Sequence, residues 1–174
     1  PVYASPIIDE DVAYVSFGDG TVVSVNRWEE EVLFYSRYYR LKQQLYWWGM
    51  GEHPGLPKGV EWASHIMGIP STTGTMDEEK LYIPTEEGRL FALDRSDGSR
   101  LWAYRSETRF LSSPTLVGST LLMGDGVGNL SAVDSFTGEQ EWRLNISSSP
   151  ISKPIVAGQK VYVTSLDGNL YALE

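Results

Sequence analysis

The sequence predicts an all-β protein made of about four repeated units, each a small antiparallel sheet of four strands. The first observation is a repeat: three segments align without gaps at a spacing of 40 residues, at 81–94, 121–134 and 161–174. The second is the alternation of apolar and polar residues on both sides of a glycine in each segment, which is typical of a β-hairpin. The third is a fourth copy at 13–26, which begins 68 residues before its neighbour and so leaves about 28 residues inserted between the two.

The remaining strands follow from what flanks each hairpin. The hairpin turns close on Gly20, Gly88, Gly128 and Gly168, because a tight turn needs a residue that tolerates positive φ. A short strand is expected before each hairpin, at 5–8, 73–76, 113–116 and 153–156. A further strand is expected after it, carrying Trp102 in the second unit, Trp142 in the third and Phe34 at the matching place in the first. We therefore expect one domain over 1–174, with units at about 4–37, 72–105, 112–145 and 152–174.

A four-stranded unit of about 40 residues that cannot bury both its faces alone is typical of a β-propeller blade. Two segments, Ala92-x-Asp94-x3-Gly98-x3-Trp102 and Ala132-x-Asp134-x3-Gly138-x3-Trp142, resemble the tryptophan-docking motif of the PQQ-like (quinoprotein-type) propeller repeat. The resemblance covers nearly the whole chain outside the insert. It implies that each outer-strand indole docks between neighbouring blades beside a glycine, which lets the backbone approach a large ring closely. The docking residues implied are Trp102, Trp142, Gly98, Gly138, Asp94, Asp134 and Phe34.

The number of units predicts an incomplete ring. The fourth unit stops at Glu174 on its third strand, and propellers that resemble this chain usually close with seven or eight blades. An open arc leaves sheet faces and edges exposed, so another segment, a second copy or a partner is expected to complete the ring. The chain opens at Pro1 without an initiator Met or a signal peptide, which is typical of a processed protein or a piece of a larger one.

Composition excludes several classes of partner and site. Lys and Arg number 14 against 23 Asp and Glu, a net charge of −9, and such a surface repels nucleic acids and anionic lipids. No apolar run approaches the roughly 20 residues that a transmembrane helix needs. The absence of cysteine excludes disulfides, zinc–thiolate sites and thiol nucleophiles.

The resemblance to quinoproteins raises an alternative, a PQQ-dependent dehydrogenase fragment or remnant. Such chemistry needs a cofactor, a metal ion to polarise it and a carboxylate base. The enzymes that this chain resembles carry a vicinal cysteine pair, which this chain lacks. His53 and His65, with Glu52 and Glu61, match no helical ligand motif. The turn acids suit ordinary hairpin chemistry, so we predict no catalytic, cofactor-binding or metal site; they are Asp19, Glu86, Glu87, Asp125 and Asp167.

An aromatic-rich insert at about 38–68 separates the first and second units. Aligned as the connection from an outer strand to the next blade, it is expected on the same face as the hairpin turns. A short helical turn is expected at 41–45, before a run of glycines and prolines. Long loops in compact domains are usually functional or disordered, and aromatic residues and arginine supply binding hot spots. The candidate partner-binding residues are Arg37, Tyr38, Tyr39, Arg40, Tyr46, Trp47, Trp48 and Trp62.

These features together predict a non-catalytic protein–protein interaction scaffold or a subunit of a larger complex. The resemblance to bacterial envelope assembly lipoproteins with this repeat implies a periplasmic or cell-surface location. Two other interpretations of the insert stay open: a lid packed on the blades, and an aromatic platform on which sugar rings stack, as in a carbohydrate-binding module.

Overall fold

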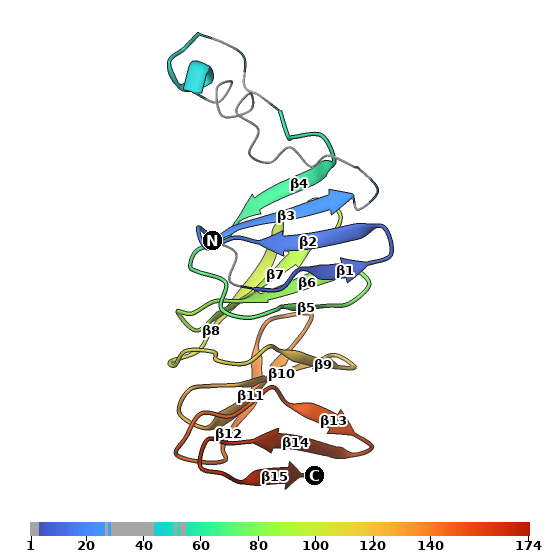
Figure 1. Ribbon diagram of the computed structural model, residues 1–174. Coiled ribbons are helices and arrows are strands. Elements are labelled where there is room, and N and C mark those ends of the chain that lie inside the picture. Colours follow the sequence, from blue (N-terminus) through green and yellow to red (C-terminus); the bar gives the residue numbers. More distant parts are fainter. Residues whose placement is uncertain (1–3, 27, 29–43, 51, 53–54) are drawn as a thin grey trace.

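The computed structural model describes residues 4–26, 28, 44–50, 52 and 55–174 of the chain. Apart from a helical turn at 44–47, the regular elements of these residues are strands. The strands form four separate antiparallel sheets, stacked in chain order (Figure 1). This confirms the predicted all-β architecture of propeller blades in an incomplete ring.

Consecutive strands pair as antiparallel neighbours within each sheet, as a meander requires. Blade 1 contains β1 (Ile7–Asp9), β2 (Val12–Ser16), β3 (Thr21–Asn26) and β4 (Val60–His65). Blade 2 contains β5 (Thr75–Met76), β6 (Lys80–Pro84), β7 (Arg89–Asp94) and β8 (Arg100–Arg105). Blade 3 contains β9 (Thr115–Val117), β10 (Thr120–Gly124), β11 (Asn129–Asp134) and β12 (Gln140–Asn145). Blade 4 contains β13 (Ile155–Ala157), β14 (Lys160–Thr164) and β15 (Leu170–Leu173).

The glycine that closes each central hairpin is required by its geometry. Gly88, in the turn between β6 and β7, has a φ of +75°, a region that residues with a side chain rarely adopt. A Cβ added there would also overlap the carbonyl oxygen of Thr108, in the loop that leads to the next blade. The turn and the loop can therefore pack together only because the side chain is absent.

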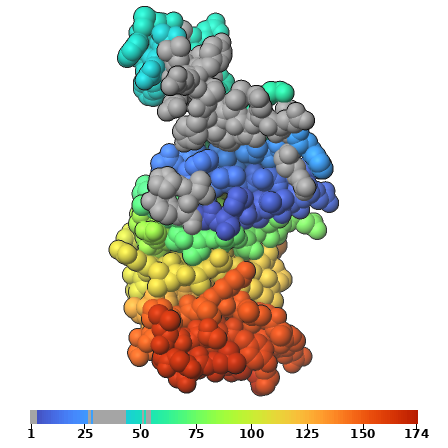
Figure 2. Space-filling model, in the orientation of Figure 1, coloured from blue at the N-terminus to red at the C-terminus, as the bar shows by residue number. Residues whose placement is uncertain are grey.

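The hydrophobic core lies between the blades. Leu81 and Ile83 of β6 face blade 1, whereas Tyr82 faces blade 3, because alternate residues of a strand point to opposite faces. Each inner blade thus supplies one apolar row to each neighbour, and Figure 2 shows the blades as successive bands of colour packed against one another. Each fully buried apolar side chain contributes about 1.5–3 kcal/mol, so the seams between blades hold the stack together.

The structure corrects the predicted bounds of blade 1. Its fourth strand is β4 at 60–65, and not the segment around Phe34, which lies outside the described residues. Trp62 pairs with Ser24 as Trp102 pairs with Ala92, and in both blades the register shifts immediately after that pair. The Asn26 N–H donates to the carbonyl of Gly59 at 2.8 Å, just as that of Asp94 donates to Ser99.

The same correction moves the insert to another face of the molecule. It lies between β3 and β4, within one blade, and not at the predicted 38–68 between two blades. The connections between third and fourth strands share a face with the turns between first and second strands, as the bond from Arg95 Nη1 to the carbonyl of Asp77 shows (2.6 Å). The insert therefore leaves the blades on the face opposite to the central hairpin turns. Among the described residues, no helix is long and apolar enough to cross a membrane.

Candidate functional site

Two tryptophans occupy equivalent places in the seams between blades. The ring of Trp102 in blade 2 lies over Gly138 of blade 3, where an added Cβ would come within 2.6 Å of the indole, and its Nε1–H donates to the Ser135 carbonyl at 3.1 Å. Trp62 of blade 1 lies over Gly98 of blade 2 in the same way and donates to the Arg95 carbonyl at 2.8 Å. The indole fills the seam only where the facing residue is glycine.

Trp62 is therefore a seam residue, and its prediction as a partner-binding residue was wrong. It is 5% exposed and packs 5.9 Å from the ring of Tyr14. The sequence carried a signal for this role, because Trp62, Trp102 and Trp142 are spaced by the 40-residue repeat. The long insert hid that spacing by displacing the expected strand.

The acidic residues of the docking motif hold the turns beneath the tryptophans. Asp94 Oδ1 accepts the backbone N–H of Ser96 at 2.8 Å, and Asp134 Oδ1 accepts those of Phe136 and Thr137. Hydrogen bonds from Ser96 and Thr137 hold the pKa of both carboxyls below its ordinary value. These turns place Gly98 and Gly138 against the preceding blade.

Trp142 stands apart from the other two seam tryptophans. It is 42% exposed, and the position 40 residues after Gly138 lies beyond residue 174. Among the described residues, no glycine lies against Trp142 as Gly98 and Gly138 lie against the other two indoles.

The described part of the insert presents an exposed aromatic cluster, which we define as Tyr46, Trp47, Trp48 and Met50. The helical turn at 44–47 carries Tyr46 and Trp47 and is held by Trp48 N–H donating to the Gln44 carbonyl at 3.1 Å. It overlaps the predicted turn at 41–45, of which residues 41–43 lie outside the described part of the chain. Trp47 and Trp48 are 80% and 67% exposed. In Figure 1 this segment lies beyond blade 1, away from the other blades. The other candidates, Arg37, Tyr38, Tyr39 and Arg40, lie outside the described residues.

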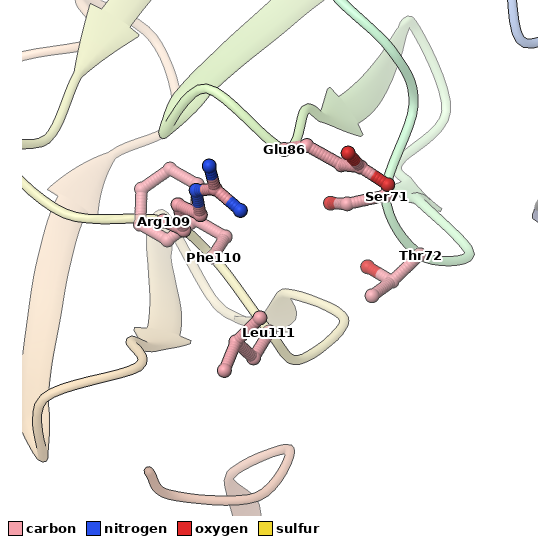
Figure 3. Close-up of a pocket in the computed structure, with 6 residues that line it drawn as sticks. All are labelled: Ser71, Thr72, Glu86, Arg109, Phe110 and Leu111. Carbon is pink, nitrogen blue, oxygen red and sulfur yellow. The ribbon is translucent and has the colours of Figure 1, made fainter.

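A pocket with both polar and apolar lining lies between blades 2 and 3, on the face that carries the central hairpin turns (Figure 3). Its volume is about 200 Å³, and its lining residues are Ser71, Thr72, Glu86, Arg109, Phe110 and Leu111. The hydroxyl oxygens of Ser71 and Thr72 are buried without a hydrogen-bond partner in the part of the chain that the structure describes. Sequence analysis missed this pocket, because its walls come from two interblade loops and one hairpin turn.

A buried carboxylate network lies beside this pocket in blade 3. Asp125 is 1% exposed and accepts hydrogen bonds from the Thr108 hydroxyl at 2.5 Å, the Asn129 amide at 2.7 Å and Arg143 Nη2 at 3.2 Å. Burial raises the pKa of the Asp125 carboxyl, but the hydrogen bonds from Thr108 and Asn129 outweigh it and leave the pKa below its ordinary value. The ionised carboxylate therefore ties the interblade loop to the hairpin turn and the outer strand.

Three of the other turn acids accept backbone hydrogen bonds nearby. Asp19 and Asp167 each accept a backbone N–H two residues on, and Glu87 accepts that of Ile69 at 3.1 Å. Glu61 accepts the hydroxyl of Ser24 at 3.0 Å, and His53 lies outside the described residues. No three His, Asp or Glu side chains among the residues described are grouped so as to hold a metal ion.

Comparison with known proteins agrees with this architecture. The family model described as outer membrane protein assembly factor BamB matches residues 48–123 and 87–174. A curated relative, the outer membrane protein assembly factor BamB of Alkalilimnicola ehrlichii, is 36% identical over 64 residues, which are 36% of this chain and 17% of that protein. The chain thus spans only a small part of that relative.

Solved structures share the fold at low sequence identity. BamB from Moraxella catarrhalis superposes with a TM-score of 0.72 at 19% identity, over 99% of this chain and 46% of that chain. The computationally designed Ika4 protein has the same TM-score at 9% identity, over 99% of this chain and 90% of that chain. Quinohemoprotein alcohol dehydrogenase from Comamonas testosteroni is more distant, with a TM-score of 0.55 at 18% identity over 83% of this chain and 21% of that one.

Three observations agree: the blades repeat, the seam tryptophans lie over glycine, and the family model matches more than half of the chain. The chain therefore belongs to the PQQ-like repeat family of outer membrane protein assembly factor BamB.

Proposed function

We propose that this chain is part of a non-catalytic, extracytoplasmic scaffold that binds a protein partner through the exposed aromatic cluster of its insert. The observation that carries the proposal is the exposure of Trp47, Trp48 and Met50, all more than 60% accessible within four residues. Trp and Tyr are the residue types that supply most of the binding energy in protein interfaces. Large rings held in solvent gain that energy only when a partner covers them.

The position of the cluster supports a docking role. It projects from blade 1 on a connection within one sheet, so a partner can bind it without separating any pair of blades. The names of the relatives, as outer membrane protein assembly factors, support a periplasmic location and a place in a membrane-associated complex. The partner is therefore expected to be another protein of the cell envelope.

Replacing both Trp47 and Trp48 with alanine is expected to weaken partner binding at least tenfold, because two hot-spot rings are lost. The thermal midpoint of the chain is expected to change by less than about 2 °C, because both rings are exposed. Site-specific photo-crosslinking in a bacterial periplasm measures the contact: a photoreactive phenylalanine at position 47 should capture an envelope protein.

Leu166 provides the matched control, because it is 81% exposed on a hairpin turn of blade 4, on the opposite face of the blades. The same photoreactive group at 166 should capture none of that protein. Equal capture from both positions would contradict the proposal. Binding of the chain to sugars on a glycan array would also contradict the proposal if it depended on Trp47 and Trp48, because the cluster would then be a carbohydrate site.

A further inference from the structure

The pocket between blades 2 and 3 contains two hydroxyl groups without a hydrogen-bond partner among the described residues. Hydroxyls of the corresponding loops in blades 3 and 4 are hydrogen-bonded. In blade 3, the Ser112 hydroxyl accepts the backbone N–H of Gly124 at 3.2 Å and donates to the same residue's carbonyl. In blade 4, the Ser152 hydroxyl accepts the N–H of Thr164 at 3.0 Å. In both blades, a hydroxyl of the interblade loop is thus satisfied by the end of the second strand.

Proline at the end of β6 explains the difference in blade 2. Pro84 stands 40 residues before Gly124 and 80 before Thr164, and proline has no backbone N–H. Its carbonyl still accepts the N–H of Ser71 at 3.1 Å, so the loop stays in place. The hydroxyls of Ser71 and Thr72, however, are buried without a partner among the described residues. Buried polar groups of this kind are costly unless water or a ligand satisfies them.

Two oppositely charged side chains border the same pocket without pairing. Glu86 comes from the hairpin turn of blade 2 and Arg109 from the loop between blades 2 and 3. No ion pair or side-chain hydrogen bond joins either of them to another described residue. In Figure 3 Arg109 lies on one side of the pocket, and Glu86, Ser71 and Thr72 lie on the other. The pocket therefore offers a charged donor on one side and an acceptor with two hydroxyls on the other, with Phe110 and Leu111 as its apolar lining.

We propose that this pocket binds the main chain of an extended peptide segment. A peptide amide is neutral and presents both a carbonyl acceptor, suited to Arg109, and an N–H donor, suited to Glu86 and the hydroxyl oxygens beside it. A free anion is disfavoured by Glu86 and by the net charge of −9, and a free cation is disfavoured by Arg109. The amide satisfies both walls at once, and a small apolar side chain of the peptide contacts Leu111.

This site is separate from the aromatic cluster and does not depend on the function proposed above. The pocket lies on the face of the central hairpin turns, whereas the insert leaves from the opposite face. A failure of peptide binding would leave the docking role of Trp47 and Trp48 untouched, and the reverse also holds.

The test is a titration of the ¹⁵N-labelled chain with an acetylated and amidated hexapeptide of alternating valine and threonine, followed by NMR. Chemical-shift changes are expected at Ser71, Thr72, Glu86 and Arg109. Arg109→Gln should weaken binding at least tenfold, because it removes the charged donor. Arg100→Gln, the same change at an exposed position on the opposite face of blade 2, should leave the affinity within twofold.

Pro84→Ala is the sharper variant, because it alters no residue that lines the pocket. The alanine supplies the missing N–H, which should engage a loop hydroxyl and weaken peptide binding at least fivefold. If its spectrum shows loss of fold, Ser71→Ala with Thr72→Val replaces it, with the same expected loss.

Three results would overturn the proposal. Sodium acetate producing the same shifts with equal affinity would make this an anion site. Shifts confined to the open edge of β15 would mean sheet-edge pairing. An unchanged affinity in both the Pro84 variant and the hydroxyl variant would show that the hydroxyls take no part.

Discussion

Trp62→Ala is expected to lower the free energy of unfolding by about 4 kcal/mol, a value within the range found when a buried tryptophan is replaced by alanine. The indole is 5% exposed, fills the seam over Gly98 and donates to the Arg95 carbonyl, so its loss leaves a cavity and an unpaired carbonyl. For a chain of this size, such a change corresponds to a fall of about 8–16 °C in the thermal midpoint. Far-UV circular dichroism during heating measures it without relying on tryptophan fluorescence.

Trp142→Ala is the matched control, because it removes the same side chain from the equivalent strand position. Trp142 is 42% exposed and faces no glycine of the described chain, so its loss is expected to cost about 1 kcal/mol. Equal losses from the two variants would refute the seam role of Trp62. If Trp62→Ala kept the normal thermal midpoint but lost partner binding, Trp62 would be a partner-binding residue instead.

Asp125→Ala is expected to destabilise the chain by about 3 kcal/mol, because it removes one member of a buried, hydrogen-bonded pair. Arg143 would lose its buried partner, and the Thr108 hydroxyl and Asn129 amide would lose their acceptor. Arg143 also pairs with Glu107 at 3.1 Å, but that carboxylate is exposed. Glu107→Ala therefore serves as the control, with an expected cost below about 1 kcal/mol. Urea unfolding of the two variants compares them directly.

The same carboxylate predicts a dependence of stability on pH. The pKa of Asp125 is lower in the folded chain than its ordinary value, so the unfolded chain binds the proton more tightly and acid favours unfolding. The contribution is fully present above the ordinary aspartate pKa of about 3.9 and is lost as the pH falls through the lower folded value. The difference in stability between the wild type and Asp125→Asn should therefore shrink between pH 6 and about pH 3. A difference that stays constant over this range would show that ionisation of Asp125 does not stabilise the fold.

Local patterns were sufficient to predict the central hairpin of each blade. Alternating residues around Gly88 and Gly128 encode a hairpin whatever surrounds them, because strand pairing and positive φ are properties of a few neighbouring residues. The 40-residue spacing then implied stacking, since no single sheet of this size buries both faces. The contact of Trp102 with Gly138 followed from the family motif, whose spacing reflects the seam between two blades.

The sequence by itself thus determined the repeated sheets, their glycine turns and the kind of residue that joins them. Only the tertiary structure decided which segment completes blade 1, because Val60–His65 pairs with Thr21–Asn26 across a long insert and local propensity carries no information about that register. That pairing buries Trp62 and moves the aromatic cluster to the opposite face. The peptide pocket was likewise decided in three dimensions: the missing N–H of Pro84 matters only because folding brings the Ser71–Thr72 loop beside it.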